Sequence, residues 1–168
     1  AYRSLALFYD GLQLTAAAEN NSTIYKQVAK KIQAFLSVAN FNHSSKDHRQ
    51  LRVPVCYEGG LAPDLKEVAN QKGLSVDEVI GLHTSTTFRV YMIGFLPGFA
   101  YMGDVPEKLA VGRRSEPRIK VPAGSVGIAG RQTGIYPFDS PGGWQLIGKT
   151  PISLFQKENA SPTLFQPG

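Results

Sequence analysis

The residues best suited to chemistry in this chain are three arginines within six positions, Arg113, Arg114 and Arg118. Guanidinium groups this close in sequence can form a fork that holds a carboxylate or a phosphate. A few residues later, the backbone at Gly124 and Ser125 is open enough to approach such a ligand. A solvated basic surface followed by a glycine turn is the alternative interpretation of the same residues.

The positive charge of the chain is concentrated in this region. The formal net charge is +5 at pH 7, and residues 113–131 carry five arginines and lysines against one acid, Glu116. So local an excess indicates an anionic ligand or an anionic partner surface. The stacking aromatics and long basic stripes of nucleic-acid-binding proteins are not interleaved with it, so we expect no nucleic-acid partner.

A second candidate feature is the stretch YMIGFLPGFAYMG, residues 91–103. It begins like a strand and continues as a loop in which glycines and Pro97 separate Phe95, Phe99 and Tyr101. The glycines let the backbone turn and the proline restricts it. The loop has no lysine and its glycines are separated by bulky side chains, which argues against a phosphate-binding loop. We expect the three aromatic side chains to form the wall of a site and not part of the core.

The pattern G-x-x-x-x-G-K-[ST] of a phosphate-binding loop occurs at residues 143–150, GWQLIGKT. That chemistry needs a flexible loop followed by a helix. Here the middle residues form a strand-like run that includes the only tryptophan, Trp144, and Pro151 follows. We interpret the segment as a strand that ends at a turn. Trp144 is expected to pack in the core, with pocket lining as the alternative.

His83 lies at the end of a predicted helix, where the helix dipole alone favours a histidine. A role in proton transfer is the alternative, and His83 is our candidate general base. The lone cysteine, Cys56, excludes an intramolecular disulfide and is expected to be a small buried hydrophobe. One cysteine and three scattered histidines provide no evident set of metal ligands.

The composition places the chain among ordinary globular proteins. Its 168 residues suffice for one domain with a sizeable core. It has no apolar run long enough to span a membrane, and its first residues lack the basic region and cleavage site of a signal peptide. With a single cysteine, these features predict a cytoplasmic protein without a membrane partner.

The spacing of apolar residues predicts the elements that position the candidate site. Residues 2–9 alternate as a strand, residues 24–35 have helical spacing, and residues 40–50 are polar. Strands are then predicted over 51–57 and 86–95, and helices over 62–73 and 75–85. Residues 94–148 hold 11 of the 17 glycines and six of the 11 prolines. Because strand-like apolar pieces interrupt them, short strands with tight turns are expected there, as in a barrel or sandwich.

Three motifs, in their order and spacing, resemble the allophanate hydrolase subunit 1 family, also known as the KipI family or the family of the 5-oxoprolinase B subunit. They are GFLPGFAYMG, RRSEPRIKVPAGSVGIAGRQTGIYP and SPGGWQLIGKTP. The resemblance covers residues 51–165 and implies a mainly β fold, a cyclophilin-like β-barrel with short helices, over 51–168. Residues 1–39 resemble the last strand and helix of the smaller α/β domain that precedes it in the family. We therefore expect a remnant of a truncated N-terminal domain, joined by a linker over 40–50.

The resemblance also implies a function. It implies a subunit of a two-subunit enzyme that uses ATP, together with a third protein, to open 5-oxoproline to glutamate. The partner would be a second cyclophilin-like subunit, of the type of KipA or the 5-oxoprolinase C subunit, and each of the two would contribute half of a composite active site. This chain alone is then not expected to be catalytically active. ATP would bind at the complex and not through residues 143–150.

Two other functions occur within the family that the motifs resemble. One is a KipI-like binding module that inhibits a histidine kinase. The other is a carboxyltransferase half-site, as in urea carboxylase, which would need biotin machinery on another chain. The residues of this sequence do not distinguish these alternatives from the enzyme subunit.

The family pattern matches this sequence position by position around the arginines and the following glycine segment, which strengthens the case for a ligand site. The predicted ligand-binding or substrate-binding residues are Phe95, Pro97, Gly98, Phe99, Tyr101, Arg113, Arg114, Arg118, Pro122, Gly124, Ser125, Gln132 and Tyr136.

Overall fold

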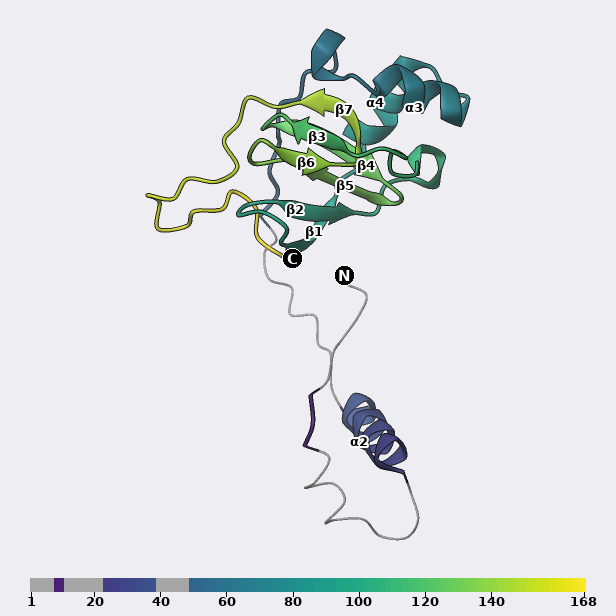
Figure 1. Ribbon diagram of the computed structural model, residues 1–168, viewed down its shortest axis with the longest axis vertical. Helices are drawn as coiled ribbons and strands as arrows, with labels where there is room; N and C mark the ends of the chain where they lie inside the picture. The colour runs from purple at the N-terminus through teal and green to yellow at the C-terminus, as the bar shows by residue number, and fades with distance from the viewer. Residues whose placement is uncertain (1–7, 11–22, 39–48) are drawn as a thin grey trace. The chain divides into compact units, whose positions relative to one another are not determined.

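The computed structural model describes residues 8–10, 23–38 and 49–168, and the chain divides into two compact units, Ala1–Arg49 and Gln50–Gly168. In the first unit the described residues include helix α2, Ile24–Val38 (Figure 1). This is the helix predicted from the spacing of apolar residues. The strand predicted over residues 2–9 lies almost entirely outside the described residues. Among the helices of the described segments, none is long and apolar enough to cross a membrane.

The second unit is built around a five-stranded antiparallel sheet with the strand order β1-β2-β5-β4-β7 (Figure 1). Its strands are β1, Arg89–Ile93; β2, Ala100–Gly103; β5, Gln132–Ile135; β4, Ser125–Ala129; and β7, Gln145–Lys149. The hairpin between β4 and β5 turns at Gly130, whose positive φ of 59° suits a residue without a Cβ.

Helices cover one face of this sheet and a small second sheet covers the other. Helices α3, Leu65–Lys72, and α4, Val76–Thr84, pack on the first face through residues such as Val68 and Val79. The small sheet pairs β3, Arg118–Val121, with β6, Ser140–Gly142, and buries Val121 against the second face. Two short 3₁₀ turns, Gly59–Leu61 and Glu107–Leu109, complete the regular elements of this unit.

Strand β4 lies between two hydrophobic cores. Val126 and Ile128 belong to the main core beneath the helices, whereas Ala129 belongs to a second core with Phe99 and Trp144. Because successive side chains of a strand point to opposite faces, a strand covered on both sides is buried at every position. All five residues of β4 are buried, in agreement with this arrangement.

The helix ends follow local sequence signals. Helix α3 ends at Gly73, which adopts the left-handed conformation with φ 64°. Helix α4 begins with the predicted capping box: Ser75 accepts a hydrogen bond from the Glu78 backbone, and the Glu78 side chain accepts one from the Ser75 backbone.

The prediction of a β-rich unit with short helices is confirmed, but closure into a barrel is not observed. In the part of the chain that the structure describes, edge strands β1 and β7 are paired with β2 and β4 and not with each other. The outer edge of β7 is met by Cys56, which exchanges backbone hydrogen bonds with Lys149, and Val90 of β1 accepts one from Gly168. Turn residues in the sequence are enough to predict short strands. Closure depends on which strands pair over long range, and local sequence signals do not show that.

Candidate functional site

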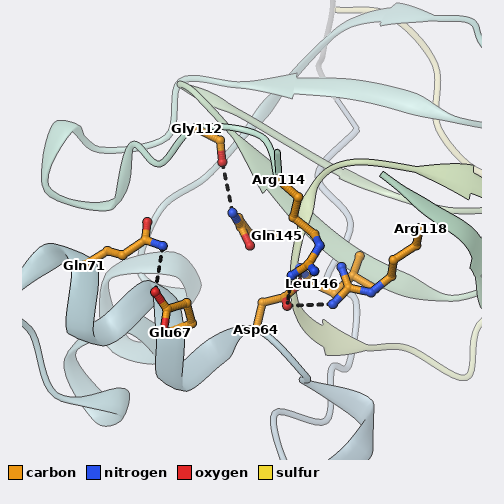
Figure 2. A network of polar contacts seen from close by, with 8 residues as sticks. All are labelled: Asp64, Glu67, Gln71, Gly112, Arg114, Arg118, Gln145 and Leu146. Atoms are coloured by element: carbon orange, nitrogen blue, oxygen red, sulfur yellow. Dashed lines mark hydrogen bonds and ion pairs between the residues drawn. The ribbon is translucent and has the colours of Figure 1, made fainter. Parts of the chain in front are cut away.

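Asp64 lies at the centre of a polar network that joins the start of α3, strand β7 and the segment that carries Arg114 and Arg118 (Figure 2). Its Oδ1 accepts hydrogen bonds from Arg114 Nη1 at 3.1 Å and from Arg118 Nη2 at 2.6 Å. Its Oδ2 accepts one from the Leu146 backbone N–H at 2.6 Å. Asp64 is only 4% exposed. Both oxygens of this carboxylate are therefore occupied within the protein.

The backbone holds Asp64 in this position at the start of α3. The Asp64 N–H donates to the Leu146 carbonyl at 2.9 Å, and the Asp64 carbonyl accepts from Val68 N–H in the first helical turn. Asp64 occupies the N-cap position, yet its side chain makes no capping bond. The carboxylate instead turns towards the arginines, so it neutralises charge between elements and does not cap a helix.

The arginines are positioned by β3 and by the turn between β6 and β7. Arg118 is the first residue of β3 and lies opposite Gly142 of β6. The Arg114 backbone N–H donates to the Gly143 carbonyl at 2.8 Å. Figure 2 shows the two guanidinium groups converging on Asp64. A loop and a strand thus bring two like charges to one buried acid.

This network leaves polar atoms without partners. Arg114 Nε, Arg118 Nη1 and Gln145 Oε1 are buried and have no hydrogen-bond partner among the described residues. Such a buried group typically costs about 1–3 kcal/mol. One carboxylate also balances only one of the two guanidinium charges. The arrangement therefore suits an additional anionic group, which would supply both acceptors and charge.

An aromatic cluster lies beside the arginines. It comprises Phe95, Phe99, Tyr101, Tyr136 and Trp144, whose rings meet edge to face at centroid distances of 4.9–6.5 Å. Burial raises the pKa of the Tyr136 hydroxyl, while a backbone hydrogen bond from Trp144 and the charges of Arg113 and Arg118 act to lower it. Tyr136 therefore lies where the cluster meets the basic segment.

Phe95 is presented by a strained turn. Its φ is 70°, and Leu96 N–H donates to the Gly94 carbonyl at 2.9 Å across it. This combination is a γ-turn with a positive φ at its centre, which is rare and strained. The Phe95 ring contacts those of Phe99 and Tyr136 but remains 59% exposed. A strained, exposed aromatic beside a charged site is typical of a residue that contacts a ligand or partner.

The aromatic wall expected from the sequence is only partly correct. Phe99 is fully buried in the second core, so that assignment is wrong for Phe99. Tyr101 is half-buried, and Phe95 alone of the three projects into solvent. The physical reason is that Tyr136 and Trp144, from distant parts of the chain, enclose Phe99.

Gly124 and its neighbours have a packing role. Gly124 has φ 81°, and an added Cβ would overlap the Thr150 carbonyl oxygen. Ser125 is buried within β4, opposite Lys149, and its backbone N–H donates to the Pro122 carbonyl. Close approach of two backbones explains the glycine here without a ligand.

The remaining predicted residues lie in two other places. Gln132 begins β5, at the opposite end of that strand from Tyr136. Gly98, with φ 82°, brings the loop that contains Pro97 against Leu154 and Phe155. Of the predicted set, the structure therefore brings Arg113, Arg114, Arg118, Tyr136 and Phe95 into one region around Asp64 and the aromatic cluster.

His83, the candidate general base, is buried in a chain of hydrogen bonds. Its Nδ1 lies 3.0 Å from Tyr57 Oη and its Nε2 lies 3.2 Å from Thr133 Oγ1. Thr133 donates its hydroxyl proton to the Gly127 carbonyl, so its oxygen accepts from His83 Nε2–H. Nδ1 then accepts from Tyr57. Burial lowers the pKa of His83 to about 4. Both ring nitrogens are used structurally, which makes His83 a poor general base.

Two further sequence interpretations can be compared with the structure. Residues 145–149 of the apparent phosphate-binding pattern form β7, so the predicted strand is confirmed, and Trp144 is buried in the second core as expected. Cys56 is exposed, so the expectation that it is a buried hydrophobe is wrong. It lies at a sheet edge where only its backbone is paired. No group of three potential metal-ligating side chains occurs within the described ranges.

Asp64 is absent from the residues that the sequence predicts for the site. In sequence it stands before a helix, where an acid is favoured by the helix dipole alone. It lies 50 residues before Arg114, and nothing local connects the two. The only available signal is the imbalance of charge, since three neighbouring arginines usually require an acid nearby if any of them is buried.

Comparisons with known proteins agree with this architecture. The B subunit of 5-oxoprolinase from Bacillus subtilis is 43% identical over 169 residues, which cover 100% of this chain and 70% of that protein. The B subunit of 5-oxoprolinase from Escherichia coli O157:H7 is 52% identical over 122 residues, covering 73% of this chain and 56% of that protein. The chain therefore spans between about half and about two thirds of the length of these relatives.

Solved structures show the same likeness. A conserved uncharacterized protein, PH0987 from Pyrococcus horikoshii, superposes with a TM-score of 0.69 and 41% identity, over 95% of this chain and 68% of that one. The Kluyveromyces lactis urea amidolyase, 20% identical with a TM-score of 0.65, shares the fold over 84% of this chain and 10% of that one. The family model described as "Carboxyltransferase domain, subdomain C and D" matches residues 1–165. The chain thus belongs to the family of the carboxyltransferase domain, subdomains C and D.

Proposed function

We propose that this chain is part of the B subunit of a cytoplasmic 5-oxoprolinase, which uses ATP to open 5-oxoproline to glutamate. The names of its bacterial relatives support this function. A second cyclophilin-like subunit, the C subunit of the same enzyme, would supply the other half of a composite active site. ATP would bind at that complex, since residues 145–149 of the apparent phosphate-binding pattern form strand β7.

The observation that carries the proposal is the pair of partly buried arginines around Asp64, each with one buried N–H group that has no partner among the described residues. Arg114 and Arg118 have the geometry to hold a carboxylate, as in 5-oxoproline, or a phosphate. Their fixed charge would also stabilise negative charge that develops on an acyl-phosphate transition state. Phe95, which is 59% exposed, would form the apolar side of the same region, with the buried Tyr136 behind it.

The general base is assigned to the partner half of the site. His83 is neutral at pH 7 and buried, and both of its ring nitrogens are hydrogen-bonded, so it has no access to a substrate. Asp64 has both oxygens occupied. This half-site therefore binds and stabilises charge, and proton transfer needs a group from elsewhere.

The test is turnover in the assembled complex. The full-length chain is co-expressed with its partner subunits, and ATP hydrolysis that depends on 5-oxoproline is measured. Replacing Arg118 with alanine is expected to lower kcat/KM by about 100-fold or more, the usual effect of removing one charge-stabilising donor. Arg131→Ala is the matched control, because Arg131 is half-exposed and its nearest acid, Glu107, is 3.9 Å away. Equal activity of the Arg118 variant and the parent would refute the proposal.

Carboxyl transfer is a second candidate function, favoured by the description of the matching family. It predicts turnover that depends on a biotin-carrying chain and not on 5-oxoproline. The same co-expressed complex, assayed with and without such a carrier, separates the two functions.

A further inference from the structure

We infer that Asp64 is a positioning residue that sets the orientation of two arginines for binding an oxyanion. The inference rests on the proposed function, because it assigns Asp64 a task at the same arginines. Asp64 itself does not contact the ligand: it is buried and both of its oxygens accept bonds from the protein. Its contribution is exerted through Arg114 and Arg118.

The geometry of the contacts shows how this works. An arginine and a carboxylate commonly pair through two parallel N–H···O bonds, which occupy one whole edge of the guanidinium. Here both arginines share a single oxygen, Oδ1, and each offers it only one nitrogen. Asp64 therefore fixes both groups while using the least of their donor capacity.

The donors that remain are the ones that lack partners. Arg114 binds Asp64 through Nη1, and its Nε has no acceptor among the described residues. Arg118 binds Asp64 through Nη2, and its Nη1 likewise has no acceptor there. These two nitrogens are themselves buried, whereas the Arg114 and Arg118 side chains as a whole are 36% and 22% exposed, so other atoms of both side chains contact solvent. An oxyanion with several acceptor atoms, a phosphate or a carboxylate, matches donors from two groups.

The rigidity of Asp64 makes it suitable for this task. Its backbone and its side chain are both tied to Leu146, by Asp64 N–H to the Leu146 carbonyl and by Leu146 N–H to Oδ2. It also opens α3 through the Val68 N–H. A side chain anchored to a strand and a helix defines the place of the arginines more precisely than exposed side chains could.

A positioning role and a purely electrostatic role of Asp64 predict opposite effects of Asp64→Asn on the affinity for anions. If Asp64 only reduced the positive charge, its replacement by asparagine would strengthen the binding of anions. If Asp64 positions the arginines, Asp64→Asn releases their orientation and weakens binding although the site becomes more positive. The sign of the change therefore separates the two roles.

The experiment titrates the full 168-residue chain with inorganic phosphate and, separately, with sodium acetate, at constant ionic strength. Binding is followed by the NMR signals of the arginine Nε–H groups. The parent chain is expected to show shifts of the Arg114 and Arg118 signals and not of the Arg131 signal. Asp64→Asn is expected to bind the preferred anion about tenfold more weakly, which corresponds to about 1.4 kcal/mol. Whether phosphate or acetate binds more tightly identifies the source of the oxyanion.

Glu67→Gln is the matched control. Glu67 is an exposed acid in the same helix whose carboxylate accepts from Gln71 and not from the arginines, as Figure 2 shows. Glu67→Gln removes one negative charge, as Asp64→Asn does, and is expected to change the affinity for the anion by less than about twofold. If Asp64→Asn does not fold, Asp64→Glu replaces it: the charge is kept but displaced by one methylene, and binding is again expected to weaken.

Three results would overturn the inference. They are anion binding by Asp64→Asn that equals or exceeds that of the parent, parent-like binding by Asp64→Glu, and parent arginine signals that neither anion shifts. The titration requires no partner subunit and no turnover. A chain that meets these expectations but supports no 5-oxoproline-dependent ATP hydrolysis would leave the role of Asp64 intact and refute only the proposed function.

Discussion

The buried histidine predicts that acid destabilises the second unit in a defined pH window. Burial lowers the pKa of His83 from 6.5 to about 4, so protonation is more favourable in the unfolded chain. Because the folded-state pKa of this base is depressed, the contribution of His83 to the free energy of unfolding is complete above pH 6.5. It is lost as the pH falls towards 4. With these values, the free energy of unfolding decreases by about 2 kcal/mol between pH 7.5 and pH 5.

The measurement is urea-induced unfolding at pH 5.0, 6.0 and 7.5, followed by the fluorescence of Trp144, the only tryptophan. Trp144 is buried in the second core, so its signal reports on this unit. His83→Gln is the comparison, because glutamine offers a donor and an acceptor but does not titrate. The variant also retains the two other histidines, so the difference between the two proteins isolates His83.

The parent is expected to lose about 2 kcal/mol more than His83→Gln over this range. The window lies above the pKa values of the carboxylates with lowered pKa, Glu78 and Asp139, which contribute only at lower pH. Parallel pH profiles for the parent and the variant would show that His83 is accessible to solvent or charged in the folded state. That result would refute both the tautomer assigned here and the structural role of the Tyr57–His83–Thr133 chain.

Two further predictions concern the backbone. Phe95→Gly is expected to be about 1 kcal/mol more stable than Phe95→Ala in urea unfolding, because both lose the ring contacts but only glycine adopts a φ of 70° without strain; equal stabilities would argue against the strained turn. Gly124→Ala is expected to lower the free energy of unfolding by about 2 kcal/mol or more, since its Cβ would overlap the Thr150 carbonyl oxygen. Gly112→Ala, whose added Cβ meets nothing within 4 Å, should change it by less than about 0.5 kcal/mol, and similar losses in both variants would contradict the packing assigned to Gly124.

Local signals in the sequence predict most elements of the second unit, but residues 51–57, expected to be a strand, form only an isolated bridge at Cys56. The capping box at Ser75 and Glu78 and the glycine after α3 mark helix ends that the structure reproduces. The strand character of residues 145–149 correctly outweighs their match to a phosphate-binding pattern. In each case the signal lies within a few residues of the feature it predicts.

Features that depend on distant partners are harder to predict. The sequence places Phe99 in an exposed wall because nothing nearby reveals that Tyr136 and Trp144 enclose it. Asp64 is not predicted as a site residue because Arg114 and Arg118 lie 50 and 54 residues away in the sequence. The sequence shows a concentration of positive charge, but only the fold shows which arginines are partly buried, and a charge withdrawn from water needs a specific counter-ion.

The pairing of the first and last segments of the second unit has a consequence for how it folds during synthesis. Cys56 hydrogen-bonds with Lys149, and Asp64 hydrogen-bonds with Leu146. The start of the unit is thus paired with β7, more than 80 residues later in the sequence. Until β7 leaves the ribosome, Asp64 lacks both of its bonds to Leu146, and the helices have no completed sheet to cover. Contacts of such long range form late and slow the overall reaction. Desolvation of the acid and its two arginines is therefore expected to belong to the last stage of folding, after the full unit has been translated.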